Sequence, residues 1–316
     1  MAAPPAVKGL VAITGGTGFI GRCVLTRLLD RGWRIRALAR RPEPWLAEAG
    51  VEVVGGALED PASLEALVDS AQAVVHCAGA ISARSRTQFA VVNRDGTAKL
   101  AAAIVARPRP PRLLLMSSLA AREPDLSPYA ASKRMAEDAA RRTLAGKADF
   151  CIVRPPVVYG PGDRATLPIF RQIRNGLLFV PAAEARFSLL YVDDLAEIVA
   201  SLLESPSWHG AVLEPDDGSG GYSWSELARI ASGHLDRRVR TVPVPWLALW
   251  LPAACAEILG VALRRAPLLT LGKLRELYHS DWTCRSELPF PAGSPRVTFD
   301  NGFAATLAWY MQRKWL

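Results

Sequence analysis

The sequence predicts an α/β fold, in which a doubly wound parallel sheet precedes a smaller, mostly helical C-terminal domain. Three observations predict it. A short apolar run breaks into a cluster of glycines and resumes with helical apolar spacing, strand-like and helix-like segments then alternate up to about residue 165, and apolar segments rich in aromatic residues follow. Apolar strands separated by helices indicate a parallel sheet covered on both faces. At 316 residues the chain can bury a full core.

The glycine cluster lies in residues 11–21, which read Val-Ala-Ile-Thr-Gly-Gly-Thr-Gly-Phe-Ile-Gly. Its glycines follow the spacing G-x-x-G-x-x-G, which supplies a permissive turn, a backbone that a pyrophosphate can approach, and close contact between helix and strand. The helix that follows would point its free N–H groups at the pyrophosphate. The stretch therefore predicts a Rossmann-type dinucleotide site formed by Gly15, Thr17, Gly18, Phe19, Ile20 and Gly21.

The next helix and strand bear on the choice of dinucleotide. Apolar spacing predicts a helix over 22–31, ended by Gly32, and a strand over 34–39. The end of that strand meets the adenosine ribose, where a carboxylate would accept the 2′-hydroxyl of NAD. This sequence has Arg40 and Arg41 there, and guanidinium groups match a phosphate instead. We therefore expect NADP; the alternative is NAD, with the two arginines merely solvated in a turn.

The alternation of strands and helices continues without an internal repeat. The turn Ala78-Gly79-Ala80 follows one of these strands and consists of small residues. The predicted segments are strands over 51–54, 73–77 and 112–116 and helices over 61–70 and 89–105.

Chemistry is expected where the strand over 112–116 ends in Ser117-Ser118, because open α/β sheets bind ligands at this edge. Further along, Tyr129 and Lys133 open a helix that runs to about residue 144, and a spacing of four places them on one helical face. A lysine ammonium and a nicotinamide cation would both favour the phenolate of this tyrosine. Tyr129 could then exchange a proton with a substrate oxygen as hydride moves to or from the cofactor, while a serine hydroxyl holds that oxygen.

Together with the glycine loop, these residues resemble the extended branch of the short-chain dehydrogenase/reductase superfamily over nearly the whole chain. The resemblance implies that Tyr129 is the acid/base, that Lys133 lowers its pKa and holds the ribose, and that Ser118 holds the carbonyl, with Ser117 as the alternative. Asn93, which opens Asn-Arg-Asp-Gly-Thr, matches the family's helix segment that begins at an asparagine and joins the catalytic set. Further cofactor contacts are expected at Leu58, Ala78, Gly79, Ser117, Tyr129, Lys133, Pro155, Val157 and Val158.

Two departures from the family pattern narrow the expectation. Ala57 stands where the family usually has an aspartate near the adenine. Pro155-Pro156 stands where nucleotide-sugar epimerases and dehydratases tend to carry an asparagine. The second departure brings the chain closer to the reductases and the members that resemble hydroxysteroid dehydrogenases. The resemblance also implies a homodimer, which no residue pattern indicates.

The domain organisation follows from the same comparison of segments. Residues 1–165 are expected to form the NADP-binding domain, and 186–215 to return and pack on it, because Tyr191-Val-Asp-Asp-Leu resembles the family's returning segment. Residues 166–185 and 216–316 would form the substrate-binding and capping region, whose apolar segments favour a hydrophobic substrate, or are the ordinary core of a capping domain. The segment 242–263 has one charge and three interrupting prolines; we expect a buried or pocket-covering helix, with peripheral membrane contact as the alternative.

Composition excludes other classes of function. The net charge of +8 comes from 32 Arg and 6 Lys without long blocks of like charge, so no nucleic-acid partner is expected. Five scattered cysteines indicate reduced thiols and no metal site, and residues 1–10 lack the apolar core of a signal peptide, so we expect a cytoplasmic protein.

The sequence thus predicts an NADP-dependent oxidoreductase that acts on an alcohol/ketone pair of a hydrophobic small molecule. Two alternatives stay open: a nucleotide-sugar epimerase or dehydratase with tightly bound cofactor, and a non-catalytic dinucleotide-binding subunit of an assembly.

Overall fold

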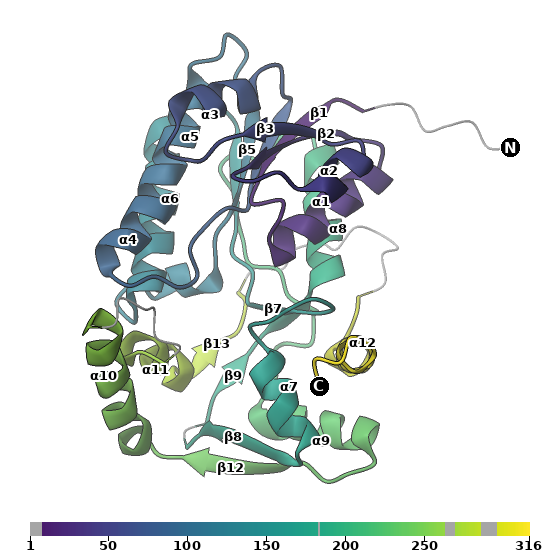
Figure 1. The fold of residues 1–316 in the computed structure, drawn as a ribbon, viewed down its shortest axis with the longest axis vertical. Coiled ribbons are helices and arrows are strands. Elements are labelled where there is room, and N and C mark those ends of the chain that lie inside the picture. Colours follow the sequence, from purple (N-terminus) through teal and green to yellow (C-terminus); the bar gives the residue numbers. More distant parts are fainter. Residues whose placement is uncertain (1–7, 183, 263–268, 286–295) are drawn as a thin grey trace, which may run out of the picture.

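A computed structural model describes residues 8–182, 184–262, 269–285 and 296–316 of the chain. A seven-stranded sheet with helices on both faces occupies the upper part of Figure 1, and a smaller region lies below it. Neighbouring strands of the large sheet pair in parallel, in the order β11-β6-β5-β4-β1-β2-β3. This order reverses at β1 and β4, which confirms the doubly wound fold and places the crevice between the ends of these two strands. The strands are β1 (Leu10–Thr14), β2 (Arg34–Ala39), β3 (Glu52–Gly55), β4 (Ala73–His76), β5 (Arg112–Met116), β6 (Phe150–Val153) and β11 (Val212–Leu213).

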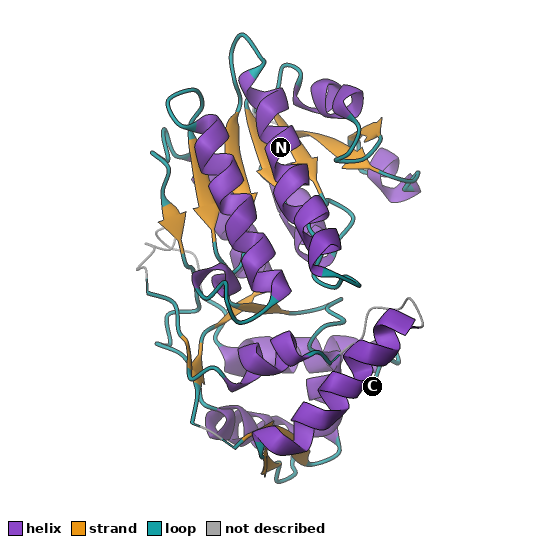
Figure 2. Ribbon diagram, turned by 90° about the vertical axis from the view of Figure 1, so that its left-hand side faces the viewer, coloured by secondary structure: helices purple, strands orange, loops and turns teal. Residues whose placement is uncertain are grey.

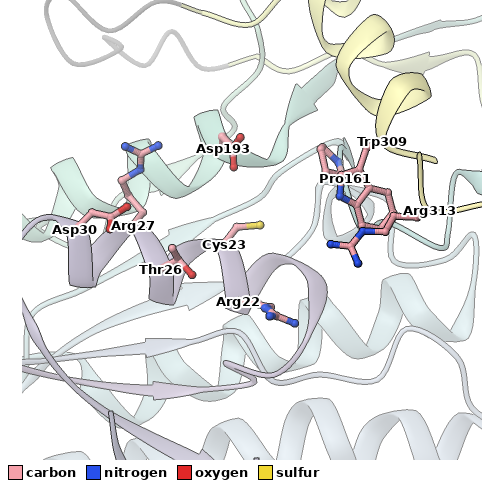
Figure 3. A pocket seen from close by; sticks show the side chains of 10 residues that line it. Arg22, Cys23, Thr26, Arg27, Asp30, Pro161, Asp193, Trp309 and Arg313 are labelled. Carbon is pink, nitrogen blue, oxygen red and sulfur yellow. The ribbon is translucent and has the colours of Figure 1, made fainter. Parts of the chain in front are cut away.

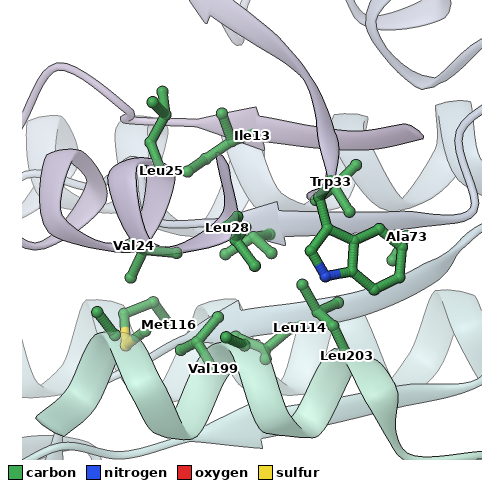
Figure 4. Close-up of a cluster of buried hydrophobic side chains, with 14 of the residues drawn as sticks. Ile13, Val24, Leu25, Leu28, Trp33, Ala73, Leu114, Met116, Val199 and Leu203 are labelled. Carbon is green, nitrogen blue, oxygen red and sulfur yellow. The ribbon is translucent and has the colours of Figure 1, made fainter. Parts of the chain in front are cut away.

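Two hydrophobic cores hold the helices on the sheet. On one face α1 (Phe19–Asp30) and α8 (Val192–Glu204) pack against each other, and Val24, Leu28 and Val199 are fully buried between them and the sheet (Figure 4). The opposite face is covered by α3 (Pro61–Val68), α5 (Gly96–Val105) and α6 (Pro128–Leu144), and α2 (Pro44–Glu48) follows β2. Because α8 and β11 come after the first six strands, the chain returns to complete this layer, and Figure 1 shows α8 beside α1.

The helix expected over 89–105 differs from the one found. It consists of α4 (Arg86–Ala90), a π-helical turn at Val91–Asp95, and α5. Single π turns inside helices often mark functional positions, and this one carries Asn93. The first helix also begins at Phe19, three residues before the expected start at residue 22, and ends before Gly32, whose φ of +79° a residue with a side chain would rarely adopt.

The lower region has its own core, in which Phe170 and Phe303 stack with ring centroids 5.0 Å apart. Three two-stranded ribbons join its helices, and β7 and β10 connect it to the large sheet. Its elements are β7 (Val157–Tyr159), α7 (Leu167–Arg174), β8 (Leu177–Pro181), β9 (Arg186–Phe187), β10 (Leu189–Tyr191), α9 (Trp224–Leu235), β12 (Arg240–Val244), α10 (Trp246–Ala262), α11 (Leu271–Tyr278), β13 (Asp281–Trp282) and α12 (Phe299–Gln312), and a 3-10 turn at Leu119–Arg122 precedes α6.

The helix expected over 242–263, either buried or covering a pocket, is found at Trp246–Ala262 and is not buried. The helix α10 packs on α11 but leaves most of its large apolar side chains exposed, because α11 covers only one of its faces. No helix among the described residues has the length and apolarity needed to cross a membrane. Residues 1–7 and Leu263, on which two of the expectations rest, lie outside the described part of the chain.

Candidate active site

The glycine loop between β1 and α1 has the geometry that a pyrophosphate requires. Gly15 has a φ of +70°, and its carbonyl accepts a hydrogen bond from the Gly18 N–H at 3.0 Å. A Cβ on Gly21 would lie 2.0 Å from the Gly15 carbonyl oxygen, so only glycine lets the first turn of α1 approach the loop this closely. No side chain caps α1, which leaves its first N–H groups free for an anion. The loop in which Thr17 lies, and the first turn of α1 with Phe19 and Ile20, therefore leave backbone N–H groups free for an anion such as a pyrophosphate.

A second loop faces the glycine loop across the crevice. A Cβ on Gly15 would lie 2.5 Å from the Ala78 backbone nitrogen, because the ends of β1 and β4 are neighbours in the sheet. Below them, the buried His76 ring contacts Thr14 Oγ1 at 2.6 Å and Thr97 Oγ1 at 3.0 Å. Burial, and secondly the Lys133 charge, lowers the pKa of His76 to about 3, so its ring stays neutral and serves as a support between β1, β4 and α5.

Three predicted site residues converge beside this loop. A Cβ on Gly79 would lie 3.1 Å from Asn93 Oδ1 and 3.2 Å from Lys133 Nζ. Asn93 is fixed by accepting from the Ala80 N–H at 2.7 Å and donating to the Ser132 hydroxyl at 2.8 Å. The Lys133 ammonium donates to the Met116 carbonyl at 3.0 Å. Burial lowers the pKa of Lys133 to about 8, and the nearby Cys77 and Glu137 oppose that shift.

The structure also brings Tyr129 to Ser118. Ser127 caps the start of α6 and places Tyr129 in its first turn, where the ring lies 6.1 Å from that of Phe89. Burial raises the pKa of Tyr129 to about 12, a hydrogen bond with the Ser118 side chain lowers it, and the Glu276 charge raises it. Lys133 is not among these influences. In the protein alone, therefore, the expected lowering of this pKa by Lys133 is absent, and the phenol keeps its proton at neutral pH.

The neighbouring serine points elsewhere. The buried Ser117 hydroxyl donates to Glu137 at 2.6 Å, and the same carboxylate accepts two hydrogen bonds from Arg154, each at 2.7 Å. Burial alone would raise the pKa of Glu137, but the bonds from Arg154 and Ser117 hold it below its usual range. Glu137 was missed in the sequence, although it follows Lys133 by four residues and so lies on the same helical face. It anchors the end of β5, from which Ser118 extends.

The remaining predicted cofactor contacts lie around the same crevice. Arg40 and Arg41 follow β2, are exposed, and form no ion pair with any described residue. Leu58 is buried against Gly96 of α5. The Pro155 carbonyl accepts from the Leu119 N–H, which ties the loop after β6 to the turn after Ser118. Val157 and Val158 form β7 beside it, with the Val157 side chain half exposed.

A separate open cavity of about 500 Å³ lies on the outer side of α1 (Figure 3). None of the predicted catalytic or cofactor-binding residues lines it. Its walls come from α1, α8, α12 and the loop after β7, and include Arg22, Cys23, Asp193, Trp309 and Arg313. Ser118, Tyr129, Lys133 and Asn93 therefore form a group apart from this cavity.

Comparisons with known proteins bear on the family to which the chain belongs. A family model described as the NAD dependent epimerase/dehydratase family matches residues 11–212. The chain is 39% identical over 313 residues to the ceramide reductase of Caulobacter vibrioides (strain NA1000 / CB15N), covering 98% of this chain and 96% of that protein.

Solved structures share the fold. The crystal structure of gox2253 superposes with a TM-score of 0.75 at 22% identity, covering 97% of this chain and 99% of that one. MoeE5 in complex with UDP-glucuronic acid and NAD superposes with a TM-score of 0.68 at 21% identity, covering 98% and 100%.

Proposed function

Because the chain belongs to the NAD dependent epimerase/dehydratase family, and is an NAD(P)-dependent oxidoreductase of the extended short-chain dehydrogenase/reductase type, we propose that it is an NADPH-dependent reductase of a ketone on a lipid of the ceramide class. The observation that carries the proposal is the meeting of Ser118 and Tyr129 at the end of β5, beside Lys133 and across the crevice from the glycine loop. The substrate class follows from the Caulobacter relative, with which nearly the whole chain aligns.

Each residue of this crevice has a separate role in the proposed reduction. NADPH, when bound, supplies the hydride. Ser118 donates a hydrogen bond to the substrate carbonyl oxygen, and Tyr129 transfers its phenolic proton to that oxygen as the alcohol forms. A phenol whose pKa burial raises to about 12 is protonated at neutral pH, which suits the direction of reduction. Lys133 would hold the ribose hydroxyls of the cofactor with its ammonium group.

The preference for NADPH rests on the end of β2. Arg40 and Arg41 are exposed there without an acidic partner among the described residues, so both guanidinium groups are available to a 2′-phosphate. Fluorescence titration of the protein with NADPH and NADH tests this, and replacing both arginines by Ala is expected to remove the preference. Tighter binding of NADH by the unchanged protein would refute it.

The reaction is tested by following NADPH absorbance with a keto lipid of the ceramide class presented in detergent. Tyr129→Phe removes only the phenolic oxygen and is expected to lower kcat by a factor of about 10² to 10⁴. The matched control is Tyr310→Phe, which removes a hydroxyl that donates to the Asp163 carbonyl from α12, outside the set of predicted site residues. Full activity of Tyr129→Phe would contradict the mechanism. A tightly bound cofactor with no net consumption of NADPH, and turnover of a nucleotide sugar, would instead identify an epimerase.

A further inference from the structure

The helix α10 presents an uncharged, apolar face to the outside of the molecule. Side chains spaced four and seven residues apart along it are exposed, with Leu247 at 79%, Leu251 at 60% and Ile258 at 71%. Trp250 and Leu259 extend the same face. Figure 2 shows this helix at the front of the lower region. A surface helix normally turns its polar side chains outward, so α10 has the opposite pattern.

The one charged side chain of α10 points inward. Glu257 accepts a hydrogen bond from the Leu271 N–H at the start of α11, at 2.9 Å. Ala253 and Gly260, on the same side as Glu257, are buried against the neighbouring elements. The helix therefore satisfies its single charge internally, and no charged group interrupts the outer face.

The helix that carries this face is joined through α11 to the turn that carries Tyr129. The helix α11, on which α10 packs, comes so close to the start of α6 that a Cβ on Gly272 would lie 2.9 Å from the Ser127 Cβ. The Ser127 hydroxyl also donates to the Glu276 carboxylate of α11. Tyr129 belongs to the same turn of α6, so a molecule that slides over α10 and α11 arrives at the proposed acid/base.

Positive charge borders the apolar face. Lys273 and Arg275 are exposed on α11, and Arg84 and Arg86 are exposed at the start of α4, whose Phe89 contacts Tyr129 from the other side. On the acidic side, Asp125 is exposed in the loop before α6, and Glu276 of α11 pairs with Lys273 at 3.4 Å. An apolar helix with basic groups beside it matches a bilayer surface that contains anionic headgroups.

We propose that α10 inserts into the surface of a lipid bilayer with anionic headgroups and so places the crevice over the membrane. A two-chain lipid can then reach Tyr129 along α10 and α11 without crossing water. The lipid substrate in this proposal rests on the proposed function. The docking of α10 on a bilayer rests on the exposed face of α10 and the charges around it.

Vesicle flotation of the full chain tests the docking. Binding is expected to vesicles of phosphatidylcholine with phosphatidylglycerol, and less to phosphatidylcholine alone. The double variant Leu251→Ser/Ile258→Ser is expected to lower the partitioning of the protein onto vesicles by about tenfold or more. Each substitution removes several CH₂ groups that would enter the bilayer. The control is Met311→Ser, which changes an equally exposed apolar residue on α12, on the other side of the lower region (Figure 1). No binding by the unchanged protein, or equal binding by the double variant, would overturn the proposal.

Cys255 gives a second readout, because it is exposed on α10 while the other four cysteines are buried or half-buried. An NBD fluorophore on Cys255 is expected to shift to the blue with vesicles and to be quenched by spin-labelled lipid. If the fluorophore is shifted to the blue without vesicles, and light scattering shows a dimer for the unchanged protein and a monomer for the double variant, a second copy of the chain covers α10 instead. Reduction of a short-chain, water-soluble keto amide by the unchanged protein separates the two proposals. If the protein does not reduce this substrate, the proposed function is contradicted, while the vesicle-binding result is unaffected.

Discussion

Glu137 is expected to contribute more to stability than any exposed acidic residue on the same helix. Its side chain is fully buried, and it accepts hydrogen bonds from Ser117, from Nε and Nη2 of Arg154, and from Arg141 at 3.2 Å. Glu137→Leu leaves Arg154 with Glu214, at 3.3 Å, as its remaining partner. Breaking a buried pair by removing one member costs about 3–5 kcal/mol of the free energy of unfolding, and the surviving Glu214 contact places the expected loss near the lower end, about 3 kcal/mol.

Urea denaturation of the two proteins measures this loss. The matched control is Asp138→Asn, one residue further along α6, because Asp138 is 40% exposed and its pairs with Arg134 and Arg141 lie near the surface. That change is expected to cost less than about 0.5 kcal/mol. Equal losses for the two variants would refute the reasoning, since burial is the difference between them.

Glu137 also makes the free energy of unfolding depend on pH, and the direction of its pKa shift determines the sign of this dependence. The folded-state pKa of Glu137 is lowered, so the carboxylate contributes stability above its unfolded pKa, and this contribution is lost as the pH falls through the folded value. The gap in unfolding free energy between the unchanged protein and Glu137→Gln is therefore expected to stay constant near neutral pH and to narrow on acidification. A gap that widens on acidification would contradict the assignment.

Three further outcomes follow from the site. Gly21→Ala is expected to weaken dinucleotide binding more than about tenfold in a fluorescence titration, because its Cβ would overlap the Gly15 carbonyl, whereas Gly233→Ala, with open space around it, leaves affinity unchanged. Because burial lowers the pKa of Lys133 to about 8, kcat for reduction is expected to fall above about pH 8 as the ammonium loses its proton. The variant Lys133→Arg is expected to move this fall to higher pH. If the pH profiles of kcat are the same for the variant and the unchanged protein, Lys133 is not the source of the fall. Ser118→Ala is expected to lower kcat more than Ser117→Ala does. Ser117→Ala is expected mainly to lower the urea midpoint, because it removes one hydrogen-bond donor to Glu137. A larger loss of kcat in Ser117→Ala would show that Ser117 holds the substrate carbonyl.

The sequence predicted those parts of the fold that depend on local pattern. The glycine spacing located the loop before α1, and the apolar run over 112–116 coincides with β5, because both signals come from neighbouring residues. The π-helical turn at Asn93 was not predicted, since apolar spacing continues through it. The choice between Ser117 and Ser118 depends on Glu137, which reaches the strand end from α6. Likewise, the apolar composition of α10 could not reveal which of its faces another helix would cover.

The measurement that tests the central claim most directly is a single-turnover reaction with NADPH deuterated at the transferable position. The account predicts that the lipid alcohol gains one deuterium at its carbinol carbon with the unchanged protein, and that Tyr129→Phe forms almost none in the same time. Deuterium that stays in the cofactor, with the lipid ketone unreduced, would contradict it.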